Sequence, residues 1–204
     1  MAGGRGRKAI DLEMQGTKGN RQRIWEAIRV KHEGFTAYEV SRRARTDDTA
    51  VRSYLQSLIK GGFIEVIAGG RFEEQTLRLI KDVGAEAPAV TRQGKISTAG
   101  KGTEAMWRTL RILGEMDADE LAEHASISSP TTSWTARAYL KWLKRAGYII
   151  EVKASRPGQK ARYILAPGKY TGPRPPMIQR IGQVFDPNLG KVVFRQSAAL
   201  EVEL

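Results

Sequence analysis

Apolar residues recur every three or four positions within the stretch from Ser126 to Tyr170. This spacing places them on one face of an α-helix. They are Ala136, Tyr139, Leu140 and Leu143. Several Ser and Thr residues before them are able to cap the helix, Pro130 suits its first turn, and Gly147 suits its end. The pattern predicts a helix that buries one side against a core.

Two short strands are predicted after this helix. Their segments, Tyr148–Val152 and Ala161–Leu165, are rich in aromatic and β-branched residues. Between them, Ser155–Lys160 contains a Pro-Gly pair, which is typical of a turn. The helix is therefore expected to be followed by a β-hairpin.

The first half of the chain has the same order of elements. Arg21–His32 has a helical pattern, and Ala37–Ala44 is a second, shorter helix. Thr36 and Glu39 have the spacing of a capping box at the start of that second helix. A third helix extends to Lys60 and precedes two strands. The strands are Phe63–Ile67 and Thr76–Lys81.

The two halves align as an internal repeat. The segment AVRSYLQSLIKGGFIE at residues 50–65 matches TARAYLKWLKRAGYII at residues 135–150. Upstream of these segments, the match places Trp25 opposite Trp107. Corresponding apolar, glycine and capping positions over most of each half indicate a duplication.

The segment TAYEVSRRARTDDTAVRSYLQSLIKGGFIEV (residues 36–66) and its second copy resemble the winged-helix superfamily of bacterial and phage DNA-binding proteins. The resemblance is to proteins of the kind seen among MarR- and ArsR-like regulators. It implies that the third helix of each copy enters the major groove, and that the hairpin, or wing, touches the DNA backbone or the minor groove. Two copies in one chain resemble a regulator dimer built into a single polypeptide.

The expected fold is mainly α with small β-hairpins (α+β), arranged as two tandem winged helix-turn-helix domains. A segment rich in Gly, Ser and Thr between the domains is expected to be a flexible linker. The last segment has the pattern of a further hairpin and is expected to be a C-terminal extension. The expected ranges are 1–19 for a basic N-terminal arm, 20–90 for domain 1, 91–103 for the linker, 104–175 for domain 2 and 176–204 for the extension.

The chain is strongly basic. Its 204 residues include 34 Lys or Arg and 22 Asp or Glu, which gives a formal net charge of +12. This charge favours a nucleic acid as partner, with an acidic membrane surface as the weaker alternative. No apolar run approaches ~18 residues, and the N-terminus lacks the apolar core of a secretory signal. We therefore expect a cytoplasmic protein with no membrane partner.

Features of a catalytic or cofactor site are not found in the sequence. It has no Cys, and His32 and His124 lie far apart without ligand-like spacing, so neither disulfides nor a zinc site is expected. It has no nucleotide-phosphate loop and no nucleophile paired with histidine. An acidic cluster from Asp117 to Glu123 stands at a helix start, where it complements the helix dipole. We expect neither an enzyme nor a bound cofactor.

The two copies differ in charge. From Ser126 to Arg174 there are ten Lys or Arg and one acid, Glu151, whereas Arg45 to Ala89 holds six Lys or Arg and seven Asp or Glu. The second copy is therefore expected to dominate affinity for DNA. For the first copy, two interpretations stay open: a smaller DNA contact, or a contact with a protein or a second copy of the chain. The C-terminal extension is the other candidate for such a contact.

Residues near the start of a recognition helix reach base edges, and later ones reach phosphates. Arg137 is the best candidate for a bidentate contact with guanine. Trp134 either meets a thymine methyl or sugar, or packs on neighbouring protein, and the later cations either contact phosphate or form a solvated face. The predicted DNA contacts in this copy are Thr131, Thr132, Ser133, Trp134, Arg137, Lys141, Lys153, Arg156, Lys160 and Arg162.

A smaller set of DNA contacts is predicted elsewhere. In the first copy it comprises Arg45, Thr49, Arg52 and Arg71. In the N-terminal arm, Arg5 and Arg7 each follow a glycine and either follow a narrow minor groove or belong to a solvated tail.

Together these features predict sequence-directed binding of double-stranded DNA, most simply in transcriptional regulation in a bacterium or phage. One alternative is an accessory factor in replication, partition or transposition. Another, of a different class, is a winged-helix scaffold that binds protein or RNA.

Overall fold

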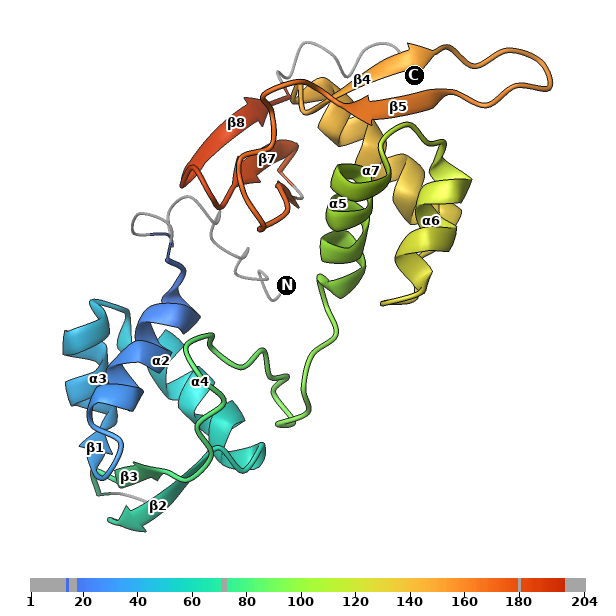
Figure 1. The fold of residues 1–204 in the computed structure, drawn as a ribbon. Coiled ribbons are helices and arrows are strands. Elements are labelled where there is room, and N and C mark those ends of the chain that lie inside the picture. Colours follow the sequence, from blue (N-terminus) through green and yellow to red (C-terminus); the bar gives the residue numbers. More distant parts are fainter. Residues whose placement is uncertain (1–13, 15–17, 71–72, 180, 197–204) are drawn as a thin grey trace, which may run out of the picture. The chain divides into compact units, whose positions relative to one another are not determined.

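The computed structural model describes residues 14, 18–70, 73–179 and 181–196. Within these residues the fold is mixed α/β, with six helices and small antiparallel sheets (Figure 1). The chain divides into two compact units. We call residues 18–98 the first unit and residues 99–196 the second unit.

The first unit contains three helices followed by two strands, as the sequence predicts. A further two-residue strand before the second helix completes an antiparallel sheet of order β1-β3-β2. The elements are α2 (Asn20–Val30), β1 (Phe35–Thr36), α3 (Ala37–Ala44), α4 (Asp48–Lys60), β2 (Ile64–Ala68) and β3 (Thr76–Leu79).

Local chemistry accounts for the helix boundaries in the first unit. The predicted capping box is confirmed: the N–H of Glu39 donates to the Thr36 hydroxyl at 3.3 Å, and the N–H of Thr36 donates to the Glu39 carboxylate at 3.0 Å. Asp47 caps α4. Trp25 lies fully buried in the core, where its indole N–H donates to the Gly84 carbonyl at 2.8 Å.

The second unit also begins with three helices and a hairpin, and it ends in a three-stranded sheet (Figure 1). Its helices are α5 (Lys101–Leu113), α6 (Ala118–Ser126) and α7 (Ser133–Arg145). Its strands are β4 (Ile149–Lys153), β5 (Arg162–Leu165), β6 (Met177–Gln179), β7 (Gln183–Asp186) and β8 (Lys191–Arg195).

The two units share a buried tryptophan, a backbone pairing and a capping box, which the aligned sequences predict only in part. Trp107 is buried like its counterpart Trp25, and its indole N–H donates to the Gly172 carbonyl at 3.0 Å. Met116 pairs with Tyr163 in an antiparallel bridge, which corresponds to the pairing of β1 with β3 in the first unit. A second capping box, at Asp117, starts α6. The repeat therefore extends to long-range backbone contacts.

The segment expected to be a flexible linker is partly folded. Thr91 donates its N–H to the Lys95 carbonyl at 2.8 Å, and the turn between them lies against the end of α4, where the Lys60 ammonium donates to the Arg92 carbonyl at 3.4 Å. Gly94 has φ +81°, and a Cβ on it would lie 2.4 Å from Lys60 backbone. Since α5 begins at Lys101, little of the range 91–103 remains as a linker.

The segment expected to be a C-terminal extension belongs to the core of the second unit. Val184 and Phe185 of β7 are fully buried, and Phe194 of β8 meets Trp142 of α7 edge-on, with 6.1 Å between ring centroids. The buried carboxylate of Asp186 accepts a hydrogen bond from the Tyr148 hydroxyl. The boundary at residue 175 therefore does not separate two compact units, because the apolar face of this sheet is needed to cover α7.

Candidate nucleic-acid interface

Helix α7 is amphipathic in the way the sequence predicts. All four residues of its apolar stripe are buried in the core of the second unit. The helix begins one turn later than Pro130 suggested, because the Thr132 hydroxyl caps it by accepting the N–H of Thr135 at 3.2 Å. Pro130 therefore lies in the preceding loop rather than in the first turn. The exposed residues of α7 are Trp134, Thr135, Arg137, Lys141, Lys144 and Arg145.

The hydroxyl groups before α7 are already engaged within the chain. Thr131 donates its hydroxyl to the Ser129 carbonyl at 2.9 Å, and the hydroxyls of Thr132 and Thr135 lie 2.9 Å apart. The Ser133 hydroxyl hydrogen-bonds the Asp119 carboxylate. These groups build the turn, and the predicted donation to phosphate requires them to exchange partners.

The hairpin of β4 and β5 has a basic tip that projects beyond the helices (Figure 1). Arg156 and Gln159 exchange backbone hydrogen bonds of 2.9 and 2.8 Å across the tip. Gly158 has φ +77°, a backbone conformation that glycine adopts without strain. Arg156 and Lys160 are exposed there.

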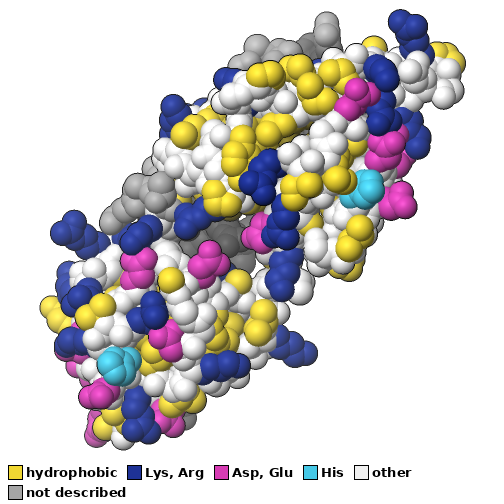
Figure 2. Space-filling model, viewed as in Figure 1, with side chains coloured by type: hydrophobic (Ala, Val, Ile, Leu, Met, Phe, Trp, Pro, Cys, Tyr) yellow, Lys and Arg dark blue, Asp and Glu magenta, His cyan; other side chains and the backbone are white. Residues whose placement is uncertain are grey.

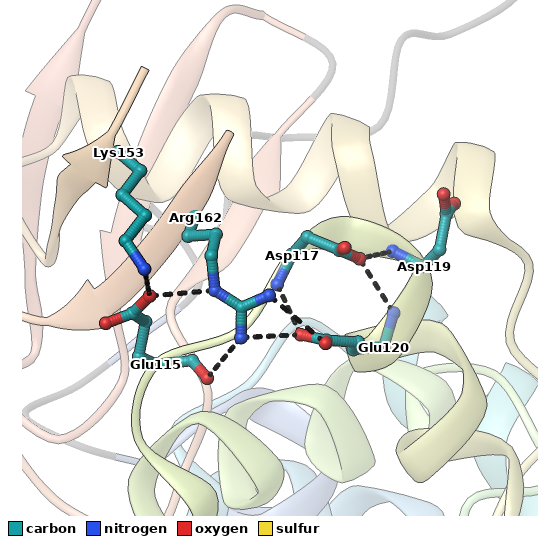
Figure 3. A network of polar contacts seen from close by, with 6 residues as sticks. All are labelled: Glu115, Asp117, Asp119, Glu120, Lys153 and Arg162. Carbon is teal, nitrogen blue, oxygen red and sulfur yellow. Dashed lines mark hydrogen bonds and ion pairs between the residues drawn. The ribbon is translucent and has the colours of Figure 1, made fainter. Parts of the chain in front are cut away.

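Three carboxylates at the start of α6 pair with the cations that the sequence assigns to DNA contacts, and Figure 3 shows the pairs of two of them, Glu115 and Glu120. Glu115 lies 3.3 Å from the Lys153 ammonium and 2.8 Å from the Arg162 guanidinium. Glu120 lies 3.1 Å from Arg162, on the other side of its guanidinium. The hairpin is thereby tied to α6.

Asp119 joins three elements. Its carboxylate lies 3.1 Å from the Arg137 guanidinium of α7 and 2.8 Å from the Lys160 ammonium of the hairpin. The sequence indicates only that this residue complements the helix dipole of α6. We call Glu115, Asp119 and Glu120 the carboxylate cluster.

The cluster is charged at neutral pH. The hydrogen bond from Lys160, then that from Ser133 and the nearby charge of Arg137, lower the pKa of Asp119 from its ordinary 3.8 to about 2. Hydrogen bonds from Lys153 and Arg162 lower the pKa of Glu115. The N–H of Asp117, followed by Arg162, lowers the pKa of Glu120. The site is therefore a set of ion pairs and not of neutral acids.

The pKa of Asp119 leads to a prediction for acid stability. Because the pKa of Asp119 is lower in the folded protein than its ordinary 3.8, the ion pairs of Asp119 stabilise the fold fully above about pH 4, and this contribution is lost as the pH falls through and below about 2. We expect wild type to melt at a higher temperature than Asp119→Asn at pH 7, and the difference to shrink below about pH 4 and to vanish about one pH unit below the folded pKa. Circular dichroism melts measure it. The control is Glu104→Gln, which removes an exposed carboxylate that forms no ion pair with the described residues. A difference between wild type and Asp119→Asn as large at pH 2 as at pH 7 would contradict the assignment.

In the described part of the second unit, two of the cations predicted to contact DNA form no ion pair. They are Lys141 on α7 and Arg156 at the hairpin tip, and both are exposed. Arg145, further along α7, packs its guanidinium over the Trp142 ring at 5.5 Å. Two cations are thus available without breaking an ion pair.

Trp134 does not pack on the described part of the chain. It is the second residue of α7 and is 78 % exposed, so the alternative that it packs on the preceding helix or on the described strands of the extension is wrong. Ile127, in the turn before α7, is 86 % exposed. The start of the helix therefore presents apolar surface beside cations.

In the first unit, the predicted contacts lie around α4. Arg45, which precedes α4, is exposed and in the left-handed conformation, with φ 48°. Thr49 is exposed in the first turn. Arg52 lines an open hollow of about 520 Å³ together with Glu73 and Glu74, so its surroundings are acidic. Arg71, Arg5 and Arg7 lie outside the described residues.

Comparison with known proteins gives no match to any family model or to any curated sequence. Within the described residues, no three His, Asp or Glu side chains are placed to hold a metal ion together. No helix in the described part of the chain is both long enough and apolar enough to cross a membrane.

Proposed function

We propose that the second unit is a winged helix-turn-helix domain that binds double-stranded DNA, with α7 in the major groove and the β4–β5 hairpin as its wing. The supporting observation is the exposed cationic face of α7 beside a projecting hairpin with a basic tip, in one compact unit. Three helices followed by a hairpin are the element order of this fold. The net charge of +12 favours the same partner.

The proposed contacts divide along the helix. Arg137, in the first half of α7, is proposed to contact a guanine edge, and Lys141 and the wing residue Arg156 are proposed to contact phosphates. Binding through Arg137 requires its exchange from Asp119 to DNA. The exchange gives up the ion pair with Asp119, so this carboxylate competes with DNA for the Arg137 side chain.

The first unit is proposed to be a second winged helix-turn-helix domain with a weaker DNA contact. Its helix α4 carries Arg52, but Glu73 and Glu74 stand beside that residue and would repel phosphate. A contact with another protein or a second copy of the chain is the alternative for this unit. Two unequal DNA-binding domains fit a transcriptional regulator, and they also fit an accessory factor in replication, partition or transposition.

A protein or RNA scaffold is the second candidate function. It is favoured by the mixture of charges, because Lys and Arg are interleaved with Asp and Glu on the face seen in Figure 2. A protein partner with its own mixed charges would suit such a surface.

Salt titrations test the proposal. We expect the chain to bind a duplex more tightly than single-stranded DNA or RNA, with a steep dependence on salt. Replacing Lys141 and Arg156 with alanine should flatten the plot of log affinity against log salt by about 2. The control, Arg108→Ala with Lys191→Ala, removes the same charge from α5 and β8 and should change the slope little. Equal binding of all three polyanions, or equal effects of the two double variants, would contradict the proposed interface.

A further inference from the structure

One large aromatic side chain, at the start of α7, does not contribute to the core of the second unit. Trp134 is 78 % exposed, whereas Trp25 and Trp107 are buried in the two cores and Trp142 is half-buried against β8. Folding therefore does not account for an indole at this position. Ile127, on the preceding turn, adds a second exposed apolar side chain.

The surroundings of Trp134 indicate what it meets. Arg137 and Lys141 follow it by three and seven residues, so they share its side of the helix. Ala138, four residues on, is small and leaves the indole face uncrowded. A large apolar ring that is bordered by cations suits a polyanion with an apolar group close to its charges.

Unmodified duplex DNA offers one such group in the major groove. The bases present hydrogen-bond donors and acceptors there, and the only apolar feature is the C5-methyl of thymine. A residue in the first turn of a recognition helix is the one that reaches base edges. We propose that Trp134 packs against a thymine methyl and makes the second unit selective for thymine at one position of its site.

This inference rests on the proposed DNA binding, and it adds to that proposal a preference for one base, thymine. It also separates the two copies, because the residue aligned with Trp134 in the first unit is Thr49, whose small hydroxyl side chain offers far less apolar area. The two units are then expected to prefer different sequences.

Removing only the methyl tests the inference. Duplexes that wild type binds are first selected from a random library. The selected pool is then amplified with either dTTP or dUTP, so that the two products differ only in the C5-methyl of thymine. Burial of one methyl predicts about fourfold tighter binding of the thymine pool by wild type. Trp134→Ala should bind the two pools equally. Lys141→Ala, the control on the same helix face, should weaken both pools and keep their ratio.

Each outcome decides the matter. Equal affinities of wild type for the two pools, or an unchanged preference in Trp134→Ala, would overturn the inference while leaving DNA binding intact. Preferential loss of single-strand binding in Trp134→Ala would replace it with base stacking. Absence of any duplex binding or enrichment would overturn the proposed function, and this inference with it. Circular dichroism should show an unchanged melting temperature for Trp134→Ala, because the side chain is exposed.

Discussion

Replacing Trp107 with alanine is expected to lower the free energy of unfolding of the second unit by about 3–5 kcal/mol. The side chain is 1 % exposed. Its ring lies edge-on to Tyr148 at 5.7 Å and stacks on Tyr170 at 5.8 Å, and its N–H donates to Gly172 at 3.0 Å. Alanine would leave a cavity beside both aromatic rings and would remove the donor to the partly buried Gly172 carbonyl.

Urea unfolding followed by circular dichroism measures this loss. The matched control is Trp134→Ala, which removes the same side chain from an exposed position and is expected to change stability by less than about 0.5 kcal/mol. The first unit has its own core around Trp25, so its transition should stay in place. A single transition that shifts for both units together would contradict their independence, and equal effects of the two substitutions would contradict the burial of Trp107.

The helices of both units were predictable because their signals are local. The buried stripe of α7 follows from apolar spacing alone, and the capping box at Thr36 follows from two residues three positions apart. The duplication strengthened each assignment, since a pattern in one copy could be checked against the other. The sequence offers four candidate caps for α7, of which the structure uses the last, Thr132, and only the first-turn position expected for Pro130 is wrong.

Long-range packing could not be read from those patterns. Nothing local in β7 indicates that Val184 completes the core of the second unit, or that Asp186 receives the Tyr148 hydroxyl. The turn that Gly94 makes against the end of α4 depends on a close backbone approach, while its composition resembles a linker. Both features depend on contacts whose partners lie elsewhere in the chain.

The ion pairs of the carboxylate cluster could not be predicted from local sequence patterns either. The stretch from Ser126 to Arg174 contains one acid. Extending this stretch back to Glu115 adds five Asp or Glu and no Lys or Arg. Those acids stand at the start of α6, where the helix dipole already explains them. Only the fold brings Asp119 to Arg137 and Lys160. Pairs of opposite charge across elements require tertiary structure to be seen.

Neutralising the carboxylate cluster is expected to increase affinity for arbitrary duplexes. In the double variant Glu115→Gln with Asp119→Asn, the cations that these acids hold become available to phosphates. If two or three more phosphates are neutralised, the slope of log affinity against log salt should become steeper by about 2–3. Binding near 0.1 M salt should then tighten by about 10- to 100-fold. Glu120 is left in place because it also forms the capping box of α6.

Selectivity should fall in the same variant. The cluster orients Arg137 and also competes with phosphate for it, so its removal favours contacts that carry no sequence information. The control is Glu104→Gln with Glu123→Gln, which makes the same change in net charge at exposed acids without ion pairs. Fluorescence anisotropy with a selected and a scrambled duplex, at several salt concentrations, gives both the slope and the ratio of affinities. If the two double variants behave alike, the cluster acts only through net charge, and its pairing with the wing has no part in DNA binding.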